Sequence, residues 1–298
     1  MTTDSAAGRL AHLGILRFSG ADALSFLQGQ LSNDTQQLTA STPVLAAYST
    51  AQGRVLALIY LLPHSSGAIA ILPREILEPT MERMRKFILR AKVRIEDAAD
   101  TLLVAGQFGA TPQDDSRYVE QDGIGMAPVG HDANRRWIIG PPEKIAAPAD
   151  AAAARQIENE WRLADIRAGL PQVYAATSEA FVAQMLNLDL LDGISFSKGC
   201  YTGQEIIART QHLGRIKRRL FRLLLPPGSW SVGQALRLAD GRHGRLTEVI
   251  ESRGRTEALA VLSVEASSAG GGDAPGEPVV EAAELPLPYS LLGPHMRE

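Results

Sequence analysis

The most informative part of this chain is Lys198-Gly199-Cys200-Tyr201-Thr202-Gly203-Gln204-Glu205. It places the only cysteine of the 298 residues close to a lysine and between two glycines. A nearby ammonium group favours the thiolate, which is the form that attacks electrophiles and binds metals. The glycines tolerate backbone angles that other residues avoid, or let a ligand approach the main chain closely. This chemistry predicts a loop of defined backbone conformation that carries a functional thiol. The local residues are equally compatible with a buried structural cysteine.

The residues that precede this loop, 173–197, have little regular periodicity. Long irregular segments inside compact proteins are more often functional than not. Further upstream, Pro141-Pro142 and the alanine-rich residues 146–154 predict a boundary. Ile157 and Trp161 then open a helix that we expect to end at Gly169.

Towards the N-terminus, strands and helices alternate, which predicts an α+β fold. One helix follows Ser19-Gly20-Ala21-Asp22 and should bury Leu24, Leu27 and Leu31. A second carries Leu77, Met81, Met84 and Ile88 at helical spacing, with Pro79 early in it, where a missing amide donor is tolerated best. The predicted strands are residues 13–18, 44–49, 54–62, 68–72, 93–95, 102–105 and 137–139. We interpret Ser32-Asn33-Asp34 as turn residues unless a pocket lies there, and residues 111–135 as rich in turns.

Towards the C-terminus, the pattern changes to short strands separated by glycine turns. These strands are residues 221–225, 235–238, 244–250 and 258–264, and they predict a small β-barrel that begins near Lys217. Residues 267–278 are rich in glycine and small side chains, which is typical of a flexible loop.

Composition limits the function. The formal net charge of -3 gives no global attraction to nucleic acid, so we do not expect direct nucleic-acid binding. One alternative hypothesis is nevertheless a tRNA-binding module. It would use the basic cluster Arg215, Lys217, Arg218 and Arg219. A single cysteine fits a reducing compartment. We find neither a signal peptide nor an apolar run long enough to span a bilayer, and therefore expect a cytoplasmic protein without membrane contact.

Metal and anion chemistry would need more than the thiol alone. Iron-sulfur clusters are generally held by several thiolates, so Cys200 could serve only as one shared ligand beside those of a partner. The cationic residues Lys198, Arg162, Arg167 and Arg209 could together attract an anionic ligand, because guanidinium groups bind carboxylates through paired hydrogen bonds.

The loop, with Gly193-Ile194-Ser195-Phe196 before it and Ala208-Arg209 after it, closely resembles the signature of the YgfZ family. These proteins are folate-binding relatives of the glycine-cleavage T-protein, the aminomethyltransferase GcvT. Three further stretches agree with the family pattern: residues 26–34, residues 47–54, and Asp165-Ile166-Arg167-Ala168-Gly169-Leu170-Pro171. The resemblance therefore covers nearly the whole chain.

The resemblance implies a GcvT-like cloverleaf of three subdomains around a central channel that holds tetrahydrofolate or a derivative. We expect a folate-binding α+β region over residues 1–216, divided near residues 145–155, and a β-barrel over residues 217–298. The implied function is iron-sulfur cluster assembly or repair, with assembly or client proteins as partners and an indirect effect on tRNA modification. A cluster shared through Cys200 is a further possible cofactor.

One departure separates this chain from the T-proteins. These carry acidic residues, including the catalytic aspartate, just after the glycine of the second hairpin, whereas here Gly53-Arg54-Val55-Leu56-Ala57-Leu58-Ile59 has no carboxylate. An aliphatic side chain accepts no proton, so conventional aminomethyl transfer is not expected. The alternative is a folate-dependent one-carbon transferase or demethylase that uses another acid. A smaller departure from the YgfZ pattern is the missing proline in Phe181-Val182-Ala183-Gln184.

The predicted site therefore has two parts. Cys200 is the redox or cluster-contacting thiol, and Lys198 tunes it. The predicted cofactor-binding residues, which line or brace the folate channel, are Arg167, Tyr201, Gln204, Glu205 and Arg209.

Overall fold

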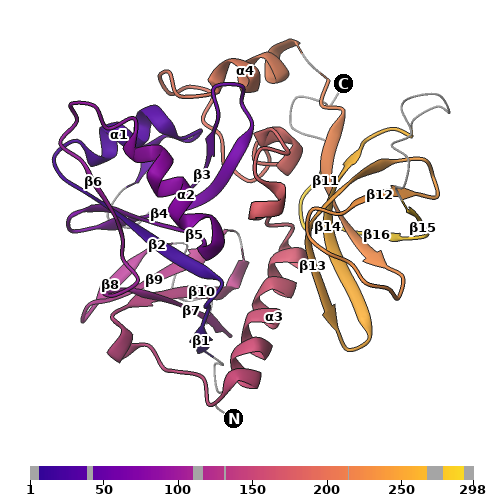
Figure 1. The fold of residues 1–298 in the computed structure, drawn as a ribbon, viewed down its shortest axis with the longest axis horizontal. Helices are drawn as coiled ribbons and strands as arrows, with labels where there is room; N and C mark the ends of the chain where they lie inside the picture. The colour runs from indigo at the N-terminus through magenta and orange to yellow at the C-terminus, as the bar shows by residue number, and fades with distance from the viewer. Residues whose placement is uncertain are drawn as a thin grey trace.

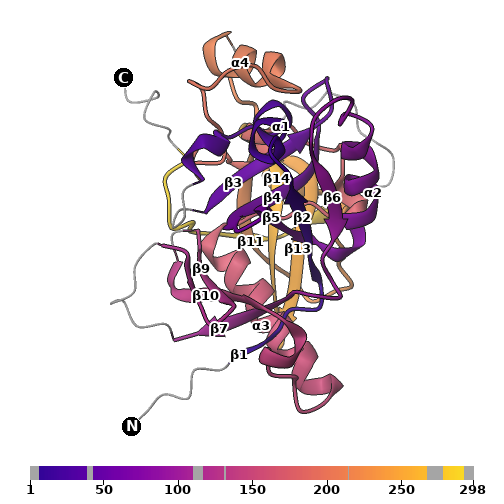
Figure 2. The ribbon, with the colours of Figure 1, turned by 90° about the vertical axis from the view of Figure 1, so that its left-hand side faces the viewer.

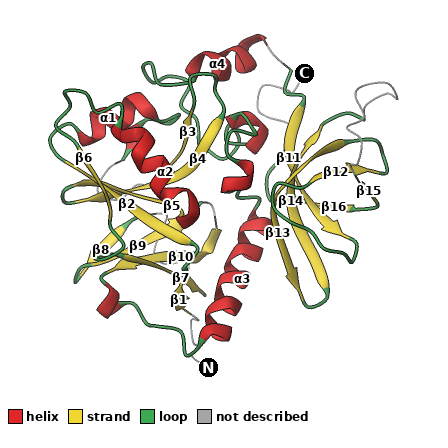
Figure 3. Ribbon diagram, viewed as in Figure 1, coloured by secondary structure: helices red, strands yellow, loops and turns green. Residues whose placement is uncertain are grey.

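Three β-sheets organise the computed structural model, which describes residues 7–38, 43–109, 117–130, 132–213, 215–266 and 278–291. Figures 1 and 3 show two sheets on one side of a long helix, α3 (Ala151–Ala168), and the third sheet on the other. The predicted mixture of helices and sheets is confirmed, and sheets dominate it.

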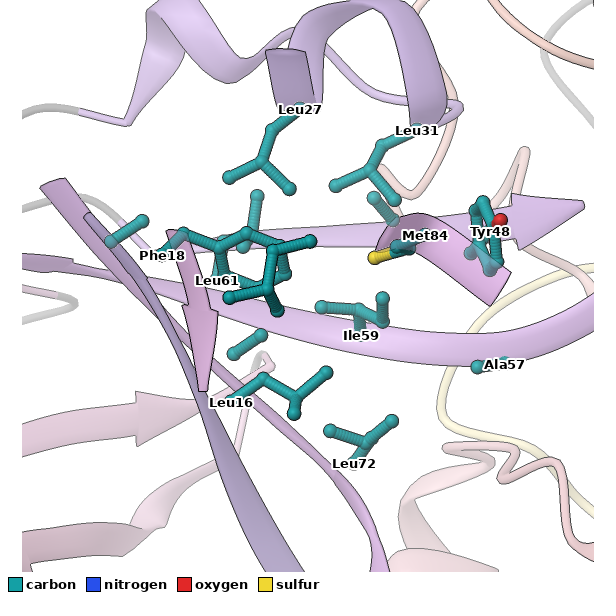
Figure 4. Packing of buried hydrophobic residues seen from close by; sticks show 14 of the residues in the cluster. Leu16, Phe18, Leu27, Leu31, Tyr48, Ala57, Ile59, Leu61, Leu72 and Met84 are labelled. Carbon is teal, nitrogen blue, oxygen red and sulfur yellow. The ribbon is translucent and has the colours of Figure 1, made fainter. Parts of the chain in front are cut away.

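The first sheet is covered by helices on one face and by the second sheet on the other. Its strand order is β3-β4-β5-β2-β6. Along β4, Ile59 and Leu61 point towards helices α1 and α2 (Figure 4), while Tyr60 and Leu62 pack towards the second sheet. Burial on both faces explains why β4 is a nearly continuous apolar run. The elements are β2 (Leu13–Ser19), α1 (Ala23–Gln30), β3 (Val44–Ser49), β4 (Val55–His64), β5 (Gly67–Pro73), α2 (Arg74–Arg85) and β6 (Arg94–Asp97).

The predictions for α1 and α2 need three corrections, the first of which is that Ile88 lies after α2, which ends at Arg85. Leu27 and Leu31 are buried as predicted, but Leu24 is 38% exposed. The buried side of α1 is centred on Ala23, Phe26 and Leu27, and at about 100° per residue Leu24 falls on its flank. Pro79 is the sixth residue of α2, beyond the first turn where we expected it.

The second sheet supplies the other half of this core. Its order is β1-β7-β10-β9-β8, and Val104, Trp137 and Ile139 pack with Tyr60 of the first sheet. Strands β8 and β9 lie where the sequence predicted turns, although residues 110–116 and 131 of that region are outside the described residues. The strands are β1 (Ala7–Arg9), β7 (Leu103–Phe108), β8 (Val119–Gln121), β9 (Ile124–Val129) and β10 (Asp132–Gly140).

Helix α3 runs between the two halves of the molecule. Asp150 caps it by accepting hydrogen bonds from the N–H groups of Ala152 and Ala153. The helix therefore starts inside the alanine-rich segment that we had interpreted as a boundary, because alanine favours helix and the cap fixes its first turn. It ends at Gly169, whose φ of 66° confirms the predicted glycine stop.

The third sheet has the order β15-β12-β13-β14-β11-β16 and curves like half a barrel in Figure 1. Its four longest strands, β11 to β14, confirm the four strands predicted from the sequence. The closed barrel, the cloverleaf, and the subdomain limits stay predictions, and residues 267–277 lie outside the described residues. The strands are β11 (Arg218–Leu225), β12 (Ala235–Leu238), β13 (His243–Ser252), β14 (Arg255–Ser263), β15 (Val279–Val280) and β16 (Ala283–Leu285).

Candidate functional site

The irregular segment before the thiol loop is held by buried polar side chains. It contains two 3-10 turns, η3 (Ala175–Thr177) and η4 (Ala183–Leu186). The amide of Gln184 donates to the carbonyl of Ile207 at 2.8 Å, and the amide of Asn187 donates to the carbonyl of Leu220 at 2.9 Å. Both side chains are fully buried, so the segment is fixed to α4 (Gln204–Leu213) and to the third sheet.

Lys198 anchors the loop to the end of α1. Its ammonium group donates hydrogen bonds to the carbonyls of Gln28 at 2.7 Å, Leu31 at 2.8 Å and Asn33 at 2.8 Å. It also lies 4.9 Å from the centre of the Tyr201 ring. Burial lowers the pKa of Lys198 to about 8, against a smaller opposing effect of Asp34. The ammonium group is held by carbonyls at the end of α1. That Lys198 also tunes the thiol of Cys200 stays a prediction.

The backbone of the loop also packs closely on the hairpin between β3 and β4. Gly203 has a φ of 85°, and a Cβ atom added to it would lie 2.6 Å from the carbonyl oxygen of Thr50. The N–H of Thr202 donates to the carbonyl of Gly29 at 3.2 Å. The loop can take this shape only with glycine at position 203.

The cysteine side of the loop faces solvent. Cys200 is an exposed free thiol, which removes the buried structural cysteine as an alternative. A Cβ atom added to Gly199 would meet nothing within 4 Å. Phe196, two residues before the loop, is 45% exposed although it is a large apolar side chain. The thiol therefore lies on an open edge that a second molecule can reach.

A cavity of about 550 Å³ opens beside the same loop. Its walls come from the first sheet, the second sheet, the segment after α3, and the end of the irregular segment just before the loop. A little more than half of its lining surface is apolar, and polar side chains come from Asn33, Gln37, Asp192, Ser195 and Ser197. The lining residues are Asn33, Gln37, Pro43, Val44, Leu45, Tyr60, Pro128, Gly130, Leu170, Leu191, Asp192, Ile194, Ser195, Phe196 and Ser197.

A buried polar network fixes this wall. The hydroxyl of Ser32 donates to the carbonyl of Gly193 at 2.6 Å, and the amide of Asn33 donates to the carbonyl of Asp192 at 2.6 Å. The hydroxyl of Ser195 accepts a hydrogen bond from the N–H of Lys198 at 3.2 Å. Ser32 and Asn33 thus serve the turn, as interpreted from the sequence, and Asn33 also lines a cavity. Sequence patterns did not identify Asp192, Ser195 and Ser197 as cavity residues, although the neighbouring signature could have pointed to them.

The predicted cofactor-binding residues lie outside this wall. Tyr201 is buried in the core, and the side chain of Gln204 accepts a hydrogen bond from the N–H of Tyr201 at 3.3 Å. Glu205 and Arg209 form an exposed ion pair on α4 at 3.1 Å. Arg167 lines a second cavity of about 520 Å³, which shares Leu170 and Leu191 with the first. As folate ligands, these five residues stay predictions.

The cations that we expected to act together have separate partners. Arg162 pairs with Glu248 at 2.5 Å, Arg167 pairs with Glu257 at 2.7 Å, and Lys198 is held by carbonyls. Each charge is thereby used in a different contact between elements. A shared anion site for this set stays a prediction, and ion pairs that join α3 to the third sheet already engage two of its members.

The basic cluster that follows α4 is also divided. Arg219 is buried and forms two hydrogen bonds with Asp189, at 2.6 and 2.8 Å, so it fastens β11 to the irregular segment. Arg215, Lys217 and Arg218 instead line a pocket beside the ends of β11, β13 and β14 in the third sheet.

Two kinds of feature, a cluster of metal ligands and a membrane-spanning helix, are absent from the part of the chain that the structure describes. In that part, no three His, Cys, Asp or Glu side chains gather closely enough to hold a metal ion. Equally, no helix within the described ranges has the length and apolar character to cross a membrane.

Comparison with known proteins agrees with the signature. No family model matches the chain. The tRNA-modifying protein YgfZ of Colwellia psychrerythraea is 32% identical over 224 residues, which cover 71% of this chain and 69% of that protein. The protein of the same name from Hamiltonella defensa is 30% identical over 243 residues, covering 76% and 70%.

The fold agrees as well. The aminomethyltransferase T of the glycine cleavage system from Bartonella henselae is similar in structure, with a TM-score of 0.63 over 87% of this chain and 78% of that protein. The two sequences are only 14% identical, so this likeness concerns the fold alone. The relatives at 30% identity or more, which agree with the loop at residues 198–205, show that the chain belongs to the YgfZ family.

Proposed function

We propose that this chain binds a folate of the tetrahydrofolate type in the first cavity and acts in the assembly or repair of iron-sulfur proteins. Its effect on tRNA modification, the process named in its relatives, is then indirect and passes through cluster-dependent enzymes. The observation that carries this proposal is the arrangement of one loop. Asp192 and residues 194–197 line the cavity, and the exposed thiol of Cys200 follows three residues later.

The cavity suits a folate in size and chemistry. Small-molecule sites are commonly 300–1,000 Å³, mostly apolar, with a few polar groups that fix orientation. Leu170 and Leu191 offer apolar surface to the ring systems. Asp192, Ser195 and Ser197 offer hydrogen-bonding groups to a pterin. A bound tetrahydrofolate would supply a nitrogen that carries one-carbon units, and the chain would orient it and exclude water.

Cys200 provides the contact with a cluster or its carrier. One thiolate cannot hold an iron-sulfur cluster, so a cluster that reaches this edge is cargo whose other ligands belong to a second molecule. Lys198 keeps the loop docked on α1, and the open space at Gly199 leaves the thiol accessible. The cavity wall and the thiol are joined through the hydrogen bond between Ser195 and the N–H of Lys198.

Calorimetry with tetrahydrofolate tests this site. Ser197→Trp places a large side chain at an exposed position on the cavity wall, and we expect it to weaken binding at least tenfold. Ser65→Trp, in the exposed turn between β4 and β5, is the matched control and should bind like the wild type. The proposal fails if the wild-type protein binds no reduced folate at millimolar concentration, or if Ser197→Trp binds with unchanged affinity.

A second candidate function is a one-carbon transferase or demethylase that uses another acid in place of the absent hairpin aspartate. Asp192 favours it, because it is the carboxylate among the described residues that line the cavity. Its φ of 54° is an angle that asparagine also tolerates, so Asp192→Asn removes the charge with little strain. Turnover of a methylamine donor with tetrahydrofolate, lost in Asp192→Asn, would support this function; failure across donors would reject it.

A further inference from the structure

A basic pocket lies beside the ends of β11, β13 and β14 in the third sheet, where the chain leaves α4 and enters β11. Its volume is about 400 Å³. The pocket is built from the segment that leads into β11, from the start of β13, and from the end of β14. We call it the basic pocket; its lining residues are Arg215, Ile216, Lys217, Arg218, His243, Ser263, Val264, Glu265 and Ala266.

Its charges are unbalanced. Arg215, Lys217 and Arg218 supply three cations, whereas Glu265 is its one acid. Glu265 pairs with Arg215 at 2.6 Å, but both side chains are more than two thirds exposed, and such surface pairs contribute little. Lys217 has no acidic partner within the described ranges. A dianion can therefore displace Glu265 at low cost and gain three cationic neighbours.

The inner wall is ordered in a way that leaves donors available. The guanidinium of Arg218 lies 3.1 Å from Nε2 of His243, and since arginine only donates, this nitrogen is the acceptor. The main-chain N–H of His243 donates to the hydroxyl of Ser263 at 3.2 Å. Arg218 is thus held in place by one of its five N–H groups, while others remain for a ligand.

We propose that the basic pocket binds a phosphate group of a ligand. Arginine guanidinium groups match phosphate oxygens in pairs, and a lysine ammonium adds a compact point charge. A carboxylate is a weaker match, because the carboxylate of Glu265 already present neutralises only one of the three cations. Apolar side chains from Ile216 and Val264 can contact the group that carries the phosphate. The overall charge of -3 makes this attraction local, confined to the pocket.

Two probes separate the possible sources of the phosphate. Inorganic pyrophosphate, measured by calorimetry, represents a free anion. An unmodified tRNA transcript, measured by fluorescence anisotropy at several salt concentrations, represents an RNA backbone. Binding of pyrophosphate that also competes with tRNA assigns the pocket to free or terminal phosphates. Salt-dependent binding of tRNA alone assigns it to a backbone phosphate.

The decisive variant is Arg215→Ala/Lys217→Ala. We expect it to weaken binding of the effective probe at least tenfold and, for tRNA, to reduce the slope of log K against log salt by about 2. Lys86→Ala/Arg90→Ala removes the same charge from exposed positions at and after the end of α2, and should change affinity less than twofold. Glu265→Gln should tighten binding severalfold because the competing carboxylate is gone.

Three outcomes would overturn the proposal. The first is that neither probe binds the wild-type protein. The second is that the two double variants weaken binding equally, since this would show that general charge is responsible. The third is that Glu265→Gln binds more weakly than the wild type. Unfolding midpoints measured on the same preparations establish that each variant is folded.

Discussion

The two sides of the thiol loop differ in how their side chains are used. On the lysine side, Lys198 is buried and its ammonium group has three carbonyl partners. On the cysteine side, Cys200 is exposed and the space at Gly199 is open. The charged anchor Lys198 and the thiol of Cys200 are only two positions apart in the sequence. A short signature can therefore combine a residue required for folding, Lys198, with a residue that another molecule can reach, Cys200.

Substituting the anchor should have the largest effect. Lys198→Met keeps the apolar stem but leaves three carbonyl groups at the end of α1 without their donor, and buried unpaired polar groups are costly. We expect the free energy of unfolding to fall by about 3–5 kcal/mol in chemical denaturation. A loss below about 1 kcal/mol would mean that water replaces the ammonium group and that the anchor is weak.

The two glycines offer a matched pair. Gly203→Ala would place a Cβ atom at a φ of 85° and 2.6 Å from the carbonyl oxygen of Thr50, so we expect a loss of about 2–3 kcal/mol. Gly199→Ala meets open space and should change stability by less than about 0.5 kcal/mol. Equal losses in the two variants, measured by urea unfolding, would abolish the distinction between the two sides.

The anchor should also leave a signature in the pH dependence of stability. Burial lowers the pKa of Lys198 to about 8, below its unfolded value of 10.5. Between these values the unfolded chain holds a proton that the folded chain has released, so stability rises with pH. From pH 8 to pH 9 the unfolding free energy of the wild type should rise by about 1 kcal/mol relative to Lys198→Met. A constant or falling difference would contradict this environment for Lys198.

The smallest effect on stability is expected on the cysteine side. Cys200→Ser changes one exposed atom, so the unfolding free energy should stay within about 0.5 kcal/mol of the wild type. A larger loss would show that the thiol packs against the protein and would return the residue to a structural role.

The same contrast explains what the sequence could predict. Strands such as β4 and the glycine stop of α3 follow from local pattern and turn chemistry, and the signature identified the loop. The cavity wall did not follow, because Asn33 and Asp192 are 159 positions apart and meet only when the first sheet packs on the irregular segment. Local sequence also could not show that Lys198 reaches back to α1, since its ammonium partners lie 165 to 170 positions away.

In the function proposed above, Cys200 acts on another molecule while the rest of the loop supports it. The direct measurement is the level of cluster-dependent modified nucleosides in tRNA from a bacterial strain that lacks its own YgfZ and carries this chain. We predict that wild-type protein and Gly199→Ala restore these nucleosides, whereas Cys200→Ser, folded and equally abundant, does not. Full restoration by Cys200→Ser would contradict the claim and remove the thiol from the function.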